Sequence, residues 1–337
     1  MSKVRLALIG CGGMSRAHAS RFFNLSDRLE VAYCVDVDEA KAQGAAEVIT
    51  GAQVATDYHS VLADVDAALL VLPHHLHYQA TMDCLAAGKH VMVEKPMANS
   101  EQECREMIAA AAQADRVLMV AYCMRFHPLV VKMKELLDAK LLGDVFQLSI
   151  WTEQHTQFPP DSWASSAKKL GGGQLFSHGC HYIDIMLWFM GRPVRGCHLG
   201  TNYGTPWMER EGTSNVSIEF EGGALGYHFG TWGAKGSRLK YSFHAHCTEG
   251  LLDARLTEGK LVKVVGGEEE VVAECEVSKH TENEMAHFIE CIQTGQQPFT
   301  SPEESVQGLK VIWKMYEAEE QGTLADLRGC GLDQFQA

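Results

Sequence analysis

The sequence predicts an α/β chain in two parts: an N-terminal doubly wound domain with a parallel sheet, then a C-terminal α+β domain with a large, mostly antiparallel open sheet. Two observations predict this class. In the first third of the chain, continuous apolar runs alternate with amphipathic helical stretches, as in parallel strands that are buried on both faces. Beyond residue 122, apolar residues recur at every second position, the period of a strand with one buried face. We therefore expect domains at 1–122 and 123–337.

The elements of the first domain follow from these runs. Buried strands are predicted at 4–9, 31–35, 67–72, 90–93 and 117–120, with a helix at 16–23 after the first strand. A second helix is predicted at 100–112, because apolar residues recur there at helical spacing. These residues are Cys104, Met107, Ile108 and Ala111.

The second domain is predicted to contain antiparallel hairpins and two helices. Strands are expected at 216–220, 225–229 and 239–245, with a turn at 221–223 between the first two. A helix is expected over 175–190, ended by Gly191, and a final helix over 303–320, opened by Pro302.

Composition excludes several classes of protein. The chain has 29 Lys and Arg against 43 Asp and Glu, a net charge of −14, which argues against nucleic-acid binding. The first apolar run, 6–10, is too short for a signal peptide or a membrane span. Eleven scattered cysteines without a Cys-X-X-Cys pattern indicate reduced thiols, so we expect a cytoplasmic protein without membrane or nucleic-acid partners.

A glycine-rich loop follows the first predicted strand. Gly10-Cys11-Gly12-Gly13-Met14-Ser15 precedes a helical stretch, the arrangement that lets a pyrophosphate approach the backbone in a Rossmann domain. The third glycine of the usual pattern is replaced by Ser15, and an ordinary glycine-rich turn is the alternative interpretation. The next strand ends at Asp36, where a carboxylate can accept hydrogen bonds from both ribose hydroxyls. With Asp38 nearby and no predicted cation beside it, we expect NAD rather than NADP.

Two further strand ends carry polar residues. Lys95 follows the strand 90–93 within Glu94-Lys95-Pro96, and Pro73-His74-His75-Leu76-His77 follows the strand before it. Ligands of open α/β sheets bind at the carboxyl ends of the strands. A surface lysine beside a proline is the alternative for Lys95.

Together these segments closely resemble the glucose–fructose oxidoreductase / inositol dehydrogenase / rhizopine-catabolism (Gfo/Idh/MocA) family. The resemblance covers almost the whole chain and is specific to the family, although it says little about the substrate. Beyond the loop and Glu94-Lys95-Pro96, it rests on Pro73 with His77, Gly88-Lys89-His90-Val91, Arg125-Phe126-His127-Pro128, Gly171-Gly172-Gly173, Gly179-Cys180-His181 with Asp184, and the segment 288–298.

The resemblance implies NAD(P)-dependent oxidation of a secondary alcohol on a sugar or cyclitol, with Lys95 binding the reacting hydroxyl beside a cis Lys95–Pro96 bond. It carries catalytic roles onto Lys95, His181 and Asp184. The cofactor-binding residues expected are Gly10, Gly12, Gly13, Met14, Asp36, Pro73, His74, His77, Glu94 and Lys95. The substrate-binding residues expected are Lys95, Arg125, Trp163, His178 and His181.

The helix 175–190 is expected to carry the catalytic base. Ser177, His181 and Asp184 are spaced so that they can share one face. The family pattern implies that His181 takes the hydroxyl proton, a task that suits an imidazole near neutral pH. Inositol-dehydrogenase-like members usually have an aspartate four residues before this histidine, where this chain has Ser177. A structural or substrate-binding histidine is the alternative for His181, and a helix-to-sheet hydrogen bond is the alternative for Asp184.

Two histidine- and cysteine-containing segments suggest zinc ligands, 178–181 and 244–247. Alternation on a strand puts His244 and His246 on the face opposite Cys247, so we expect no metal site. We instead expect Lys240, Ser242, His244 and His246 to form the polar face of a strand, which is solvated or part of an oligomer contact. Trp163 has core packing as its alternative.

The sequence is compatible with three functions. The favoured one is an NAD-dependent sugar or cyclitol dehydrogenase, which forms a homodimer or homotetramer through the open sheet. The alternatives are a redox-neutral NAD-dependent glycoside hydrolase, which the missing aspartate at position 177 leaves open, and a non-catalytic NAD-binding sensor. Retention of both Lys95 and His181 argues against the sensor.

Overall fold

The computed structural model describes residues 3–331, which divide into two compact units. Unit 1 runs to Phe126 and resumes over Lys279–Ser305, and unit 2 comprises His127–Ser278 and the chain from Val306 on. The division differs from a single boundary at 122, because a segment near the C-terminus returns to the first unit.

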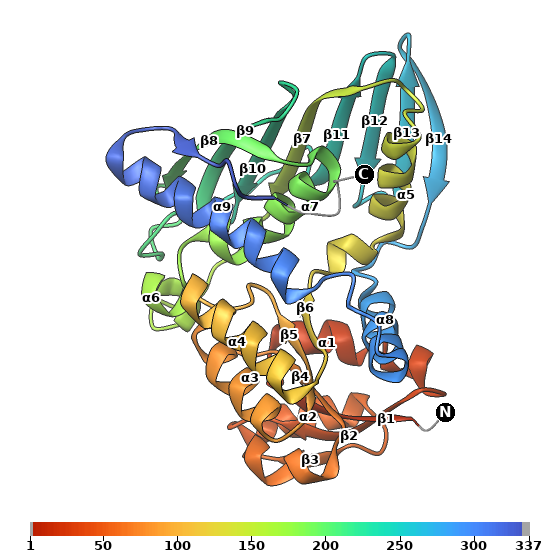
Figure 1. Ribbon diagram of the computed structural model, residues 1–337, viewed down its shortest axis with the longest axis vertical. Helices are drawn as coiled ribbons and strands as arrows, with labels where there is room; N and C mark the ends of the chain where they lie inside the picture. Colours follow the sequence, from red (N-terminus) through yellow and green to blue (C-terminus); the bar gives the residue numbers. More distant parts are fainter. Residues whose placement is uncertain (1–2, 332–337) are drawn as a thin grey trace. The chain divides into compact units, whose positions relative to one another are not determined.

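Unit 1 is a Rossmann domain. Its six-stranded parallel sheet has the order β3-β2-β1-β4-β5-β6 (Figure 1). The strands are β1 (Val4–Ile9), β2 (Leu29–Val35), β3 (Gln53–Ala55), β4 (Ala67–Leu70), β5 (His90–Glu94) and β6 (Leu118–Ala121). The helices are α1 (Gly13–Ala19), α2 (Glu39–Val48), α3 (His77–Ala86), α4 (Glu101–Ala114) and α8 (Thr281–Thr294). The five predicted strands are confirmed, whereas β3, whose three residues are all at least partly exposed, lacks an apolar run and was not predicted.

Helix α8 belongs to unit 1 because of its apolar face. Met285, Phe288 and Ile289 are buried in the same core as the strands and helices of the Rossmann sheet. The Thr281 hydroxyl at the start of α8 also donates to the Ala17 carbonyl of α1 at 3.0 Å. These contacts hold the returning segment against the N-terminal half of the unit.

Unit 2 contains a nine-stranded sheet in the order β14-β13-β12-β11-β7-β10-β9-β8-β15. All neighbouring pairs are antiparallel except β7 and β10, which are parallel. The strands are β7 (Val145–Glu153), β8 (Pro193–Thr201), β9 (Thr213–Phe220), β10 (Leu225–Thr231), β11 (Tyr241–Cys247), β12 (Gly250–Arg255), β13 (Lys260–Val265), β14 (Glu268–Glu274) and β15 (Ala325–Asp326). This confirms the predicted α+β class with a large, mostly antiparallel sheet.

The helices of unit 2 cover one face of this sheet (Figure 1). Those over the sheet are α5 (Pro128–Asp138), α7 (Cys180–Met190) and most of α9 (Pro302–Gln321), whereas the short α6 (Ala167–Leu170) packs beside the turn Trp163–Ser165. Leu148, Ile150 and Phe243 face the helices and are buried, while the alternate residues of the same strands are at least partly exposed or polar. The sheet therefore has one covered and one open face.

Three predicted elements differ from the structure. The helix expected at 16–23 is α1, which runs over Gly13–Ala19 and is followed by a separate 3-10 helix at Phe22–Leu25. Strand β11 begins at Tyr241 rather than 239, because the N–H groups of Arg238, Leu239 and Lys240 donate to the Glu153 carboxylate at 2.9–3.1 Å instead of joining the ladder. The helix predicted at 175–190 begins with a π turn, Leu175–Gly179, and only then continues as α7.

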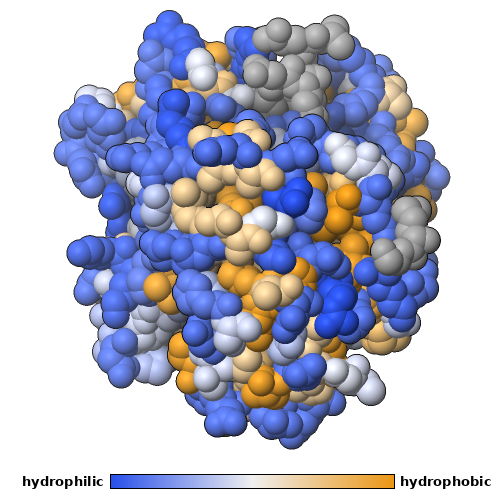
Figure 2. Space-filling model, turned by 60° about the horizontal axis from the view of Figure 1, so that its bottom comes forward, coloured by the Kyte–Doolittle hydropathy of each residue, from blue (hydrophilic) through white to orange (hydrophobic). Residues whose placement is uncertain are grey.

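The surface is mainly polar on the face that Figure 2 shows, where hydrophilic residues surround smaller groups of apolar ones. Among the described residues, no helix is both long and apolar enough to cross a bilayer.

Candidate functional site

The glycine-rich loop joins β1 to α1 in unit 1. Gly10 has φ +93°, and a Cβ at this position would lie 2.2 Å from the Val71 carbonyl oxygen at the end of β4. Only glycine fits here without a shift of backbone. A Cβ at Gly12 or Gly13 would meet no neighbour within 4 Å, so space is open above this backbone. The Ser15 hydroxyl donates to the Gly12 carbonyl at 2.6 Å, which gives the departure from glycine a structural role.

Asp36 is fixed beside this loop. Its Oδ2 accepts the N–H of Cys11 at 2.8 Å and its Oδ1 accepts the N–H of Asp38 at 2.9 Å. The carboxylate therefore lies at the edge where the loop would receive a dinucleotide. The expectation that no cation stands near is not met, because Lys41 Nζ lies 3.3 Å from Asp38 Oδ2.

Lys95 follows β5 and is partly exposed, with a cis bond to Pro96 as the resemblance implied. His77, which is fully buried, supports this bend. Its Nδ1 lies 2.8 Å from the Pro96 carbonyl oxygen and its Nε2 2.9 Å from the Leu72 carbonyl oxygen. Burial lowers the pKa of His77. The two ring nitrogens thus contact the main chain at two strand ends. His77 therefore holds these strand ends in place, and its side chain does not project toward a ligand.

A buried cluster of His18, Glu94 and Glu284 adjoins the backbone of Lys95. His18 Nε2 is 2.8 Å from Glu94 Oε1, and His18 Nδ1 is 3.9 Å from Glu284 Oε1. Glu94 Oε2 accepts the N–H of Lys95 at 3.2 Å. Burial opposes ionisation of Glu94, but the hydrogen bond and charge of His18 outweigh it and lower its pKa.

Glu284 behaves in the opposite way. Burial and then the nearby Glu94 charge raise its pKa well above the ordinary value. The cluster thus pairs a buried carboxylate at Glu94 with a carboxyl at Glu284 that favours its neutral form.

Other predicted residues of unit 1 lie in the interior. Arg125 is 1% exposed, and its Nη1 lies 2.7 Å from Glu304 Oε2 while its guanidinium stands over the Phe299 ring. Because Arg125 is buried in this ion pair, almost none of its side chain is accessible to a substrate. We therefore do not include Arg125 in the proposed site. His74 is also buried, in a short turn after Pro73, with its ring 5.6 Å from that of His77.

Met14, in contrast, is partly exposed at the first turn of α1. The Lys279 ammonium lies 3.3 Å from its sulfur, which brings a cation to the cofactor loop that the sequence did not indicate.

In unit 2, the π turn presents His178 beside His181. The two rings meet edge to face with centroids 6.3 Å apart. His178 is half-buried, and Ser177 and His181 are each 7% exposed. Insertions of this kind are frequent at functional sites. Asp184, one turn further on, is buried against the backbone of Gly308 in α9.

A row of polar side chains extends from His178, and sequence reasoning missed part of it. Gln174 Nε2 lies 3.4 Å from His178 Nδ1, and Tyr241 Oη lies 3.4 Å from His178 Nε2. The Tyr241 hydroxyl donates to Gln154. Burial raises the pKa of Tyr241 to about 12, so it remains a hydroxyl. Tyr241 follows the apolar alternation of β11, which gives it the sequence signal of a core residue.

The histidines that suggested zinc do not converge on one point. Tyr241 contacts His178 on the helix-covered face, whereas His244 and Asp253 face each other across β11 and β12 on the open face, with His244 Nε2 3.4 Å from Asp253 Oδ1. Trp163 packs against a small cluster of apolar residues, which favours its alternative role in packing. The cluster consists of Ala164, Leu170, Met208 and Trp232 with Phe158 and Trp207 around it.

Comparisons with known proteins agree with this architecture. Residues 4–122 match a model described as an oxidoreductase family with an NAD-binding Rossmann fold, and residues 130–253 match the GFO/IDH/MocA C-terminal domain. The aldose-aldose oxidoreductase from Caulobacter crescentus, solved with glycerol, superposes with a TM-score of 0.85 at 24% identity, over 96% of this chain and 100% of that one.

Two relatives of this chain differ in name and in how much of their length aligns with it. Inositol 2-dehydrogenase 2 from Saccharopolyspora erythraea is 29% identical over 66% of this chain and 65% of its own length. The 4-carboxy-2-hydroxymuconate-6-semialdehyde dehydrogenase of a Sphingobium species is 28% identical over 95% of this chain and 100% of its own. The first of these alignments thus spans less than two thirds of the relative. Because the family models of both domains match this chain, the protein belongs to the GFO/IDH/MocA oxidoreductase family.

Proposed function

We propose that this protein transfers a hydride between NAD and the carbon that bears a secondary hydroxyl of a sugar or cyclitol. The observation that carries the proposal is the geometry of one edge of the Rossmann sheet. Gly10 abuts Val71 where the strand order reverses between β1 and β4, the switch point at which open α/β sheets bind ligands. Asp36 and Lys95 follow parallel strands of the same sheet and therefore lie at the same edge.

We assign each step of this reaction to particular residues of the chain. A bound dinucleotide would supply the nicotinamide that accepts or returns the hydride. The Lys95 ammonium donates to the reacting oxygen and stabilises its developing negative charge. His181 takes the hydroxyl proton, with its neighbour His178 contacting the remaining substrate hydroxyls. We assign the cofactor to Gly10, Gly12, Gly13, Met14 and Asp36.

The polar row of unit 2 supports an uncharged polyol as substrate. Gln154, His178 and Tyr241 are partly exposed and carry an amide, an imidazole and a hydroxyl, the kinds of hydrogen-bonding group that hydroxyl ligands require, while Gln174 is fully buried and contacts His178. Arg125 and Arg210 each form an ion pair, Arg125 with the partly buried Glu304 and Arg210 with the buried Glu211. We therefore favour a sugar or cyclitol over the carboxylated substrate that the name of the Sphingobium relative indicates.

The test is to follow NADH absorbance after adding NAD and a panel of free sugars, cyclitols and aryl glycosides. Steady NADH accumulation with one polyol is the expected result, and NADP should support less turnover. Lys95→Met and His181→Ala should each lower kcat about 100-fold or more. Lys132→Met and His59→Ala, at exposed positions, are the matched controls. Full turnover by His181→Ala would refute its role, and release of an aryl group without NADH would indicate the redox-neutral hydrolase.

We also propose that the open face of the nine-stranded sheet forms a homo-oligomer contact. Leu199 is 69% and Leu225 49% exposed on this face, on β8 and β10. Trp151 contacts both Tyr227 and Phe229 there, with centroids 5.5 and 5.6 Å apart. Apolar side chains exposed on one sheet face favour association with a second copy.

A further inference from the structure

Four consecutive backbone N–H groups at the start of the π turn bind to two residues distant in sequence. Tyr316 Oη accepts from the N–H of Gly173 at 3.2 Å and of Phe176 at 3.3 Å. Glu211 accepts from the N–H of Leu175 through Oε1 at 3.2 Å and from that of Gln174 through its carbonyl oxygen at 2.8 Å. The first N–H groups of a helix have no partner within it. Glu211 and Tyr316 supply the partners that a local capping residue would otherwise provide.

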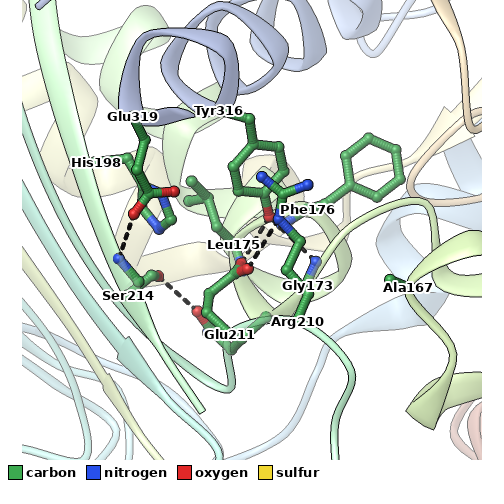
Figure 3. A network of polar contacts seen from close by, with 12 residues as sticks. Ala167, Gly173, Leu175, Phe176, His198, Arg210, Glu211, Ser214, Tyr316 and Glu319 are labelled. Carbon is green, nitrogen blue, oxygen red and sulfur yellow. Dashed lines mark hydrogen bonds and ion pairs between the residues drawn. The ribbon is translucent and has the colours of Figure 1, made fainter. Parts of the chain in front are cut away.

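The two capping residues are joined to each other and are buried. The Tyr316 hydroxyl donates to Glu211 Oε1 at 2.6 Å. The Arg210 guanidinium lies 3.8 Å from the centroid of the Tyr316 ring, and its Nε is 3.4 Å from Glu211 Oε2. Figure 3 shows Tyr316 and Glu211 directed toward the backbone at Gly173, Leu175 and Phe176. The pair is thus held from several sides.

The glycine run explains how the pair comes so close. A Cβ at Gly173 would lie 2.2 Å from Glu211 Cδ and 2.4 Å from the Glu211 carbonyl oxygen. A Cβ at Gly172 would lie 2.7 Å from Phe176 Cβ and 3.0 Å from Tyr316 Cε2. Any larger residue at 173 would displace the Glu211 backbone. The glycines therefore allow Glu211 and Tyr316 to pack closely against the start of the π turn, a role that the family resemblance did not indicate.

We propose that Glu211 and Tyr316 are positioning residues that fix the π turn and thereby orient His178 and His181 toward the substrate. The inference rests on the proposed function for the roles of these histidines. The π turn begins at the capped residues and leads directly into α7, which carries His181. A loosened cap would let the wide turn fray or shift along the chain. Such a shift rotates both histidines, and displacement of a catalytic group by about 1 Å can cost 100-fold in rate.

The central variant is Tyr316→Phe, which removes one oxygen and leaves two buried N–H groups without an acceptor. The matched control is Glu319→Gln on the same helix, because the Glu319 carboxylate contacts His198 Nδ1 at 2.9 Å and accepts the N–H of Gly200 at 2.7 Å, both on β8 and not in the glycine run (Figure 3). We expect Tyr316→Phe to lower kcat about 10- to 100-fold. The Kd for NAD should change less than about twofold, since the proposed cofactor residues belong to unit 1.

Hydrogen exchange gives a readout that needs no substrate. In Tyr316→Phe, the amides of residues 173–176 should exchange about tenfold faster or more, whereas Glu319→Gln leaves them unchanged. Glu211→Gln keeps an acceptor oxygen and should resemble the wild type more closely than Glu211→Ala does. If Tyr316→Phe folds poorly, the comparison of Glu211→Gln with Glu211→Ala tests the same inference.

The outcomes separate this inference from the proposed function. Equal kcat and equal exchange in Tyr316→Phe and Glu319→Gln, with His181→Ala inactive, would overturn the positioning role and leave the function standing. Accelerated exchange together with a fully active His181→Ala would confirm the cap but overturn its catalytic purpose, because the proposed base itself would have failed.

Discussion

His228 should make the protein lose stability in mild acid. It lies on β10 with no exposed surface, its ring stacked on Tyr182 at 5.2 Å. Its Nε2 is 3.1 Å from Thr152 Oγ1, and Thr152 donates to the Phe229 carbonyl, so Nε2 carries the hydrogen. Nδ1 has no hydrogen-bond partner among the described residues. Protonation there would bury an unpaired charge.

The magnitude follows from the pKa. Burial, with a smaller contribution from His198, lowers the pKa of His228 to about 3. An unfolded histidine titrates near 6.5. Between these values the unfolded chain binds more protons than the folded one, so stability falls as the pH decreases from about 6.5 toward 3. At pH 5 the loss from this one group is about 2 kcal/mol relative to pH 8.

The assay is urea denaturation followed by tryptophan fluorescence at pH 8 and pH 5, for the wild type and His228→Gln. The glutamine is neutral at both pH values, so the wild type should lose about 2 kcal/mol more than the variant. Comparing the two proteins cancels the other titrating groups. His59→Gln is the control, because its 57% exposed side chain is solvated in both states. A difference between wild type and His228→Gln that is the same at both pH values would refute the reasoning.

Four further outcomes are expected. Gly10→Ala should destabilise unit 1 by about 2 kcal/mol or more in urea denaturation and abolish NAD binding, because its Cβ would meet the Val71 carbonyl. Asp36→Ala should weaken NAD about tenfold in binding titrations and reduce its advantage over NADP; unchanged affinities would contradict the ribose role. Arg125→Met should cost about 3 kcal/mol of stability by removing the ion pair between the buried Arg125 guanidinium and Glu304, while the KM for substrate stays the same. Leu199→Lys combined with Leu225→Lys should convert a dimer or tetramer to smaller species in sedimentation, and a wild type that is monomeric at micromolar concentration would exclude the contact.

Much of unit 1 could be predicted because its signals are local. Alternation of apolar runs with helical stretches identifies parallel strands over windows of a few residues. The glycine loop and Asp36 are tied to the strand ends that precede them, and Cys11 and Asp36 are brought together by neighbouring parallel strands. Placement of Lys95 at the same edge follows from the same topology.

Other features depend on contacts that no local spacing encodes. The family resemblance indicates that Arg125 is accessible to a substrate. In the structure it is buried and pairs with Glu304, 179 positions later in the chain. The return of α8 to unit 1 is likewise decided by the packing of its apolar face.

Local sequence signals were sufficient to predict the fold class, the cofactor loop and the residues that the family resemblance assigns to chemistry. Which of those residues are accessible, and which contacts hold them, became clear only from the folded chain. Tyr316 joins Glu211 across 105 positions and Gly173 across 143, and this contact gives the glycine run its purpose. Periodicity within a segment indicates which face of a helix or strand is buried, whereas partners so far apart in sequence meet only when the sheet and helices have packed.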